Sequence, residues 1–236
     1  MFFGFDWTFI VLVIPALILS LWAQARVRSV YRKYACVEGS RRISGAQAAR
    51  RVLDEHGLSD VAVRPTRGEL SDHFDPRDGC VYLSEGVYGG TSVAAVGIAC
   101  HECGHAIQHA EGYAPLSWRT ALVPVVNIGS KLAFPLILAG VILTALLEND
   151  ALYFLTNLGL IAYSLATVFQ LVTLPTEFNA SSRALRAITE TGLLEAGEIK
   201  GAQKVLSAAA LTYVAALAAS AIQLLRMILI FGRRRD

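Results

Sequence analysis

Long apolar stretches alternate with polar segments along this chain. Residues 7–23 carry no charge and, with their flanks, are long enough to cross the ~30 Å hydrocarbon core of a membrane. Residues 121–147, apart from Asn127, Ser130 and Lys131, and residues 151–174 are also apolar, and the short acidic turn 148–150 joins them. This pattern predicts an N-terminal membrane anchor and, later in the chain, a transmembrane hairpin.

The basic residues give the anchor a direction. Residues 1–6 contain no Lys or Arg, and the missing positive n-region argues against a cleaved signal peptide. Six basic residues follow the anchor: Arg26, Arg28, Arg32, Lys33, Arg41 and Arg42. The positive-inside rule therefore places the N-terminus outside and the following polar segment in the cytoplasm. The Ala-rich segment 205–225 can either span the membrane, leaving the arginines at 233–235 outside, or pack on the catalytic domain.

The polar segment after the anchor begins with a predicted amphipathic helix. Ser44 and Gln47 have the spacing of a capping box, which marks a helix start. The pattern ends at His56 and Gly57, so His56 is expected to cap the helix rather than to bind a metal.

Two short strands are predicted next, at 61–64 and 80–84, with turn residues at 75–79 between them. The second strand directly precedes an apolar helix. It could be a sheet edge to which an extended peptide adds as a further strand. His73 lies just before the turn, where it could stabilise an oxyanion or make a local hydrogen bond.

Composition agrees with an integral membrane protein. The 236 residues are 54% hydrophobic and 17% charged, and the mean hydropathy is +0.48. The basic cluster at 26–42 lies beside a membrane anchor, so no nucleic-acid partner is expected. The cysteines lack the arrangement of a secreted disulfide framework and are expected to be reduced thiols without redox function. They are Cys36, Cys80, Cys100 and Cys103.

The main chemical signal is the sequence His101-Glu102-Cys103-Gly104-His105, within a helical run predicted at 92–111. Histidines four residues apart lie on one helix face, so both imidazoles can bind one metal ion from the same side. Glu102 is then placed to act as general base toward a water molecule at the metal, as in zinc metallopeptidases. The alternative is a pair of hydrogen-bonded histidines on a buried helix.

A catalytic zinc site needs a third protein ligand. His109 continues the stripe of His101 and His105, but eight helical residues separate it from His101 by ~12 Å, and no Gly or Pro breaks the helix between His105 and His109. Glu177 is the other candidate, because a two-pass hairpin returns it to the side of the zinc helix. A carboxylate at a helix start could instead simply complement the helix dipole.

Several longer stretches resemble the YugP-type neutral zinc metallopeptidases, a family of bacterial membrane proteins. They are Ala-Gln-Ala-Arg at 23–26, Ser-Asp-His-Phe-Asp-Pro at 71–76, the run 92–115, Leu-Val-Pro-Val-Val-Asn-Ile-Gly-Ser at 122–130 and Pro-Thr-Glu-Phe-Asn-Ala-Ser-Ser-Arg at 175–183. The layout is similar to that of HtpX-like proteases and implies Glu177 as the third ligand. In those relatives an Asp four residues after the Glu supports the site. Here that position is Ser181, so Asn179 or Ser181 is the expected substitute.

These features predict a mainly α integral membrane protein with a small β element, in which a transmembrane hairpin interrupts a zincin-like catalytic domain. The expected parts are an anchor (1–25), a cytoplasmic catalytic part (26–119), the hairpin (120–175), a catalytic helix with the third ligand (176–204) and an apolar helix with a basic tail (205–236).

The expected function is that of a multi-pass zinc endopeptidase of the bacterial plasma membrane, with its active site on the cytoplasmic side. One zinc ion, held by His101, His105 and Glu177, would activate water with Glu102 as base. Protein or peptide substrates at the bilayer are the expected partners, and no oligomeric state is predicted. One alternative is a membrane scaffold with a structural metal site, which would not need Glu102. Another is a site-2-type intramembrane protease, whose Leu-Asp-Gly motif is missing here.

Overall fold

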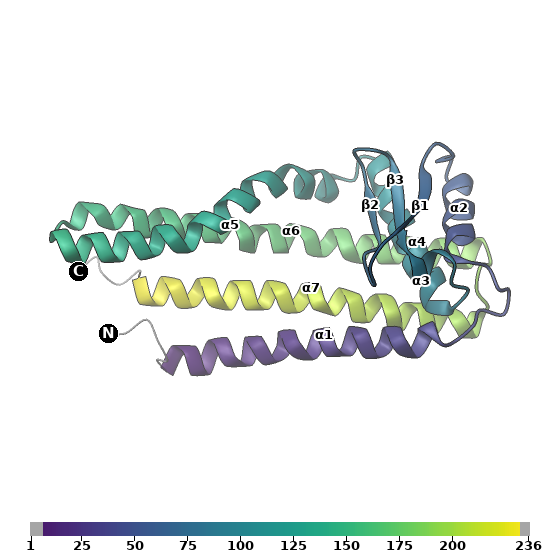
Figure 1. Cartoon of the computed structure of the whole chain (residues 1–236), viewed down its shortest axis with the longest axis horizontal. Helices are drawn as coiled ribbons and strands as arrows, with labels where there is room; N and C mark the ends of the chain where they lie inside the picture. Colours follow the sequence, from purple (N-terminus) through teal and green to yellow (C-terminus); the bar gives the residue numbers. More distant parts are fainter. Residues whose placement is uncertain (1–6, 232–236) are drawn as a thin grey trace. The chain divides into compact units, whose positions relative to one another are not determined.

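The computed structural model describes residues 7–231, which are mainly helical (Figure 1). Four helical segments are long and apolar enough to cross a membrane, namely Phe9–Ala35, Ala114–Leu147, Asp150–Glu190 and Ala196–Phe231. The described residues form one small sheet of three strands. The predicted class, a mainly α membrane protein with a small β element, is therefore confirmed.

The chain forms two compact units. Among the described residues, the first contains residues 7–22, Trp118–Leu174 and residues 213–231, and the second contains Ala23–Ser117 and Pro175–Thr212. Four long helices contribute residues to both units: α1 (Ile14–Ala35), α5 (Ala114–Leu147), α6 (Phe154–Glu190) and α7 (Ala196–Phe231). The division into functional domains drawn from the sequence stays a prediction.

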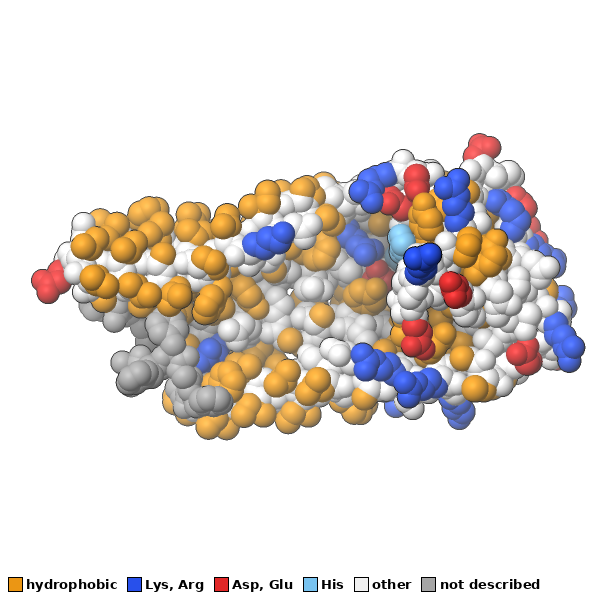
Figure 2. All heavy atoms as spheres, in the orientation of Figure 1, with side chains coloured by type: hydrophobic (Ala, Val, Ile, Leu, Met, Phe, Trp, Pro, Cys, Tyr) orange, Lys and Arg blue, Asp and Glu red, His pale blue; other side chains and the backbone are white. Residues whose placement is uncertain are grey.

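The first unit contains the predicted hairpin. A turn at Glu148 and Asn149 and the short 3-10 helix η2 (Asp150–Tyr153) connect α5 to α6, and Asn149 accepts a hydrogen bond from the Ala151 N–H. The two helices approach closely at Gly159, where an added Cβ would lie 2.7 Å from the Ala133 carbonyl oxygen. Hydrophobic side chains cover much of the exposed surface of α5 and α6 in this unit, as expected for contact with lipid (Figure 2).

α6 differs from the prediction at Pro175. The sequence predicts that a new helix begins there, but Pro175 lies inside one continuous α6. Proline removes one backbone hydrogen bond from a helix, and apolar membrane helices tolerate this loss because surrounding groups compensate for it. α5 likewise contains Pro124 and Pro135. Glu177 is therefore in a helix interior and not at a helix start.

The second unit contains the polar segment after the anchor. The predicted capping box is present at α2 (Gly45–Glu55), where Ser44 accepts from the Gln47 N–H and Gln47 accepts from the Ser44 N–H. His56 is the C-cap, and its Nδ1 lies 2.8 Å from the Val52 carbonyl oxygen, as expected for a capping residue.

The sheet corrects the prediction of a substrate-binding edge. Its strand order is β1 (Ala62–Thr66), β3 (Cys80–Ser84), β2 (His73–Asp75), with β1 parallel and β2 antiparallel to β3. The strand before the apolar helix is β3, which is paired on both sides, so it cannot receive a peptide. The sequence missed β2, because three residues are too few to show an alternating pattern.

The core of the second unit forms around α4 (Val93–Ala110), which follows β3 and the short helix α3 (Glu85–Tyr88). α4 packs against α2 and the sheet. The core also includes Ile188 of α6 and Leu206 of α7. The first part of α7 packs in this core and its later part belongs to the first unit, so whether segment 205–225 also spans the membrane stays a prediction.

Candidate functional site

α4 presents the two motif histidines on one face. The helix starts at Ser92, whose side chain accepts a hydrogen bond from the Ala95 N–H. It ends before Gly112, whose positive φ of 65° suits a helix C-terminus. Between these ends, the rings of His101 and His105 lie edge to face with their centroids 4.8 Å apart.

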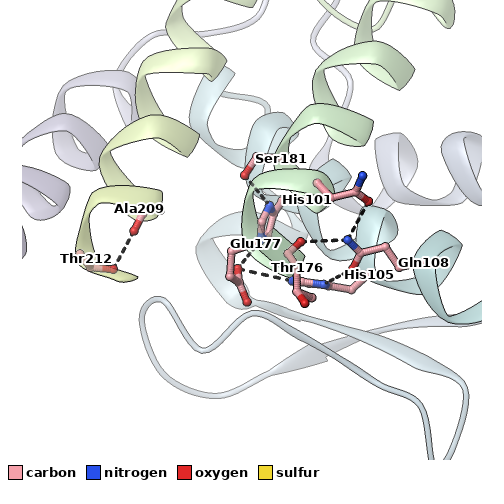
Figure 3. A network of polar contacts seen from close by, with 9 residues as sticks. His101, His105, Gln108, Thr176, Glu177, Ser181, Ala209 and Thr212 are labelled. Carbon is pink, nitrogen blue, oxygen red and sulfur yellow. Dashed lines mark hydrogen bonds and ion pairs between the residues drawn. The ribbon is translucent and has the colours of Figure 1, made fainter. Parts of the chain in front are cut away.

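α6 brings a buried carboxylate to the same place. Oε2 of Glu177 lies 3.3 Å from Nε2 of His101 and 3.6 Å from Nε2 of His105 (Figure 3). Glu177 is only 2% exposed. Because Glu177 lies well inside α6, the helix-dipole role considered from the sequence does not apply. The three side chains are the one group of metal-binding type found among the described residues.

The other histidines lie outside this group. His109 is exposed, and its ring centroid is 5.8 Å from that of Phe74 of β2. His73 is also exposed, stacks on Tyr82 and places its Nδ1 2.8 Å from the Ser71 carbonyl oxygen. This is the local hydrogen bond considered for His73 from the sequence.

Glu102 lies beside the group without belonging to it. It follows His101 directly in α4 and is 8% exposed. Its carboxylate is close enough to His105 for its negative charge to raise the pKa of that histidine.

Polar side chains hold the far side of each imidazole ring. Ser181 Oγ lies 3.2 Å from Nδ1 of His101, and Gln108 Oε1 lies 3.0 Å from Nδ1 of His105 (Figure 3). Of the two residues expected to take the place of the supporting Asp, Ser181 contacts the His101 ring, whereas Asn179 contacts Gln108. Gln108 was not among the site residues expected from the sequence. Its position three residues after His105 on the same helix is the signal that could have revealed it.

The electrostatic environment of the site favours positive charge. Burial lowers the pKa of His105, but the nearby Glu177 carboxylate and the negative charge of Glu102 outweigh this effect, so the pKa is raised above its ordinary value. By contrast, burial raises the pKa of Cys100 and Cys103, which keeps both as unreactive thiols. All four cysteines are free.

The donor set fits a catalytic zinc ion. One type of catalytic zinc site combines two His and one carboxylate ligand with an open fourth position. Ligand atoms about 2.1 Å from a tetrahedral zinc ion lie about 3.4 Å apart. The separations of 3.3 and 3.6 Å between the Glu177 oxygen and the two ring nitrogens agree with this spacing. These three residues could therefore hold one zinc ion.

Comparisons with known proteins agree with this chemistry. Residues 9–232 match the family model described as "Putative neutral zinc metallopeptidase". The chain is also 51% identical over 228 residues to the Bacillus subtilis (strain 168) protein named "Putative membrane protease YugP", a match that covers 97% of this chain and 98% of that protein. No solved structure matches the chain. The chain therefore belongs to the neutral zinc metallopeptidase family.

Proposed function

We propose that this protein is a membrane-anchored zinc endopeptidase that cleaves proteins or peptides at the cytoplasmic face of the bacterial plasma membrane. The observation that carries the proposal is the convergence of His101, His105 and Glu177, with the Glu177 oxygen 3.3 and 3.6 Å from the two ring nitrogens. Family membership supports the same reaction class.

Each residue of the site has a distinct role in this proposal. His101, His105 and Glu177 hold one zinc ion, which when bound supplies a Lewis acid that polarises the scissile carbonyl and acidifies water. Glu102 accepts the proton of the attacking water and passes it to the amine nitrogen that leaves. A buried carboxylate next to His101 favours this catalytic role over a scaffold with a structural metal site, where no base is needed.

The substrate is proposed to bind as an extended strand along β2. β2 is an edge strand of the sheet, and its outer edge is unpaired among the described residues. Phe74 of β2 lies close to His109 of α4, so the strand runs beside the helix that bears the histidines. Backbone groups of an edge strand can hydrogen-bond to a peptide of almost any sequence.

The position of the site in the cell follows from the chain. Because α5 and the first part of α6 form a hairpin, two crossings separate His105 from Glu177 and return the chain to the same side. The basic residues at 26–42 support a cytoplasmic location for that side, by the positive-inside rule. Substrates are therefore proposed to be membrane proteins, or peptides that reach the inner surface of the bilayer.

The proposal is tested by comparing the membrane proteomes of cells that make the wild-type protein or the Glu102→Gln variant at equal levels. The expected result is that full-length substrates accumulate with the variant, while new cleavage termini appear only with the wild type. Identical sets of termini in both strains would contradict proteolytic function.

A further inference from the structure

Gln108 is a fully buried polar residue next to the proposed metal ligands. It lies in α4, is 0% exposed, and makes hydrogen bonds from both ends of its amide. Its Oε1 is 3.0 Å from Nδ1 of His105, and its Nε2 donates to the Thr176 carbonyl oxygen at 2.8 Å (Figure 3). Its Nε2 also donates to Asn179 Oδ1 at 2.9 Å. One side chain therefore connects a histidine of α4 with two residues of α6.

The partners fix the orientation of the amide. The carbonyl oxygen of Thr176 can only accept a hydrogen bond, so the Gln108 NH₂ group must face it. The Asn179 oxygen accepts a second hydrogen bond from Arg183 Nε at 2.7 Å, which holds that oxygen toward both donors. With its NH₂ group committed, Gln108 presents its oxygen to His105.

This orientation determines the tautomer of His105. An amide oxygen only accepts, so Nδ1 of His105 must carry the hydrogen and donate it to Gln108. The lone pair of the neutral ring then lies on Nε2, the nitrogen that faces Glu177 at 3.6 Å. Gln108 thus selects the form of His105 that can bind a metal on the side of Glu177.

The other end of Gln108 acts on the third proposed ligand. Thr176 directly precedes Glu177 and Asn179 lies two residues after it, so the amide holds α6 on both sides of this carboxylate. The network continues from Asn179 to Arg183, which pairs with Glu111 at the end of α4 at 2.6 Å. The two helices are therefore linked through Gln108 and again through this ion pair.

We propose that Gln108 is a positioning residue that sets the tautomer of His105 and the distance between His105 and Glu177, and so determines the affinity of the site for zinc. The inference rests on the proposed function, because it assumes that these residues bind zinc. A residue that served packing alone would affect the stability of the fold without changing metal affinity in the folded protein.

The test uses the full-length protein in detergent. Gln108→Met keeps about the same volume but removes the amide, and Gln203→Met makes the same change at an exposed position of α7 as a control. Zinc affinity is measured by competition with a chromophoric chelator, and folding is followed by circular dichroism. We expect Gln108→Met to bind zinc about 10–100-fold more weakly, the range known for residues that orient metal ligands, and Gln203→Met to match the wild type.

A second variant keeps the test decisive if Gln108→Met does not fold. Asn179→Ala removes one of the two acceptors of the Gln108 NH₂ group at a partly exposed position, so a smaller loss of zinc affinity is expected. If Gln108→Met folds and binds zinc as tightly as the wild type, the inference is overturned and the proposed function stays intact. If only Asn179→Ala folds, wild-type zinc affinity in that variant has the same meaning. A wild-type protein that binds no zinc would overturn both.

Discussion

Gly104 of α4 lies directly against Ala180 of α6. A Cβ atom added at Gly104 would come within 2.6 Å of the Ala180 carbonyl oxygen and 3.1 Å of its Cα. The missing side chain therefore allows the two helix backbones to approach each other. Glu177 and Ser181 are on the same helix as Ala180, and this close approach brings both to His101.

The first prediction follows from this contact. Gly104→Ala forces the added Cβ against the Ala180 backbone, a clash that side-chain rotation cannot relieve, so α6 must move away from α4 and take Glu177 with it. We expect weaker zinc binding and a destabilisation of about 1–3 kcal/mol, the usual range for overpacking. The measurements are zinc affinity by chelator competition and thermal unfolding.

A glycine in α7 provides the matched control. An added Cβ at Gly197 meets no atom within 4 Å, so Gly197→Ala should bind zinc like the wild type. Equal zinc affinity of Gly104→Ala and the wild type would show that the distance between α4 and α6 at this point does not determine the site.

The second prediction concerns the third ligand. Glu177 lies against both histidines, whereas His109 is exposed and faces Phe74. Removing a direct ligand should weaken binding beyond the 10–100-fold expected for an outer residue. We therefore expect purified Glu177→Ala to contain almost no zinc and His109→Ala to keep nearly the wild-type stoichiometry, as measured by elemental analysis. The reverse pattern would refute the assignment of Glu177.

The third prediction separates metal binding from catalysis. Glu102→Gln keeps the shape of the side chain but removes its ability to accept a proton. We expect normal zinc content and at least a ~10²-fold loss of peptide cleavage, the typical effect of losing a general base. The assay compares cleavage of an unstructured protein by both purified forms after equal zinc loading. A fully active variant would be incompatible with the proposed mechanism.

The fourth prediction concerns membrane topology. The basic residues at 26–42 and the hairpin predict opposite locations for the β-sheet region and the hairpin turn. A reporter inserted within residues 67–71 should be cytoplasmic, and one inserted at Asn149 should be external. Both reporters on one side would show that α5 and α6 do not form a spanning pair.

The sequence predicted those features that depend on neighbouring residues. The apolar stretches indicated the membrane helices, because hydropathy is a local property, and the Ser44 cap marked a helix start through a contact three residues away. The four-residue spacing of His101 and His105 placed them on one face, because a helix has a fixed period.

The tertiary structure decided what depends on residues distant in the chain. From the local sequence alone, Pro175 predicts the start of a new helix. α6 nevertheless continues through it, because the packed helix tolerates one lost hydrogen bond. β3 is central only because β1 and β2 pair with it from opposite sides. Likewise, the contact of Glu177 with His101 spans 76 residues and the link from Gln108 to Thr176 spans 68, and both depend on how closely α6 packs against α4.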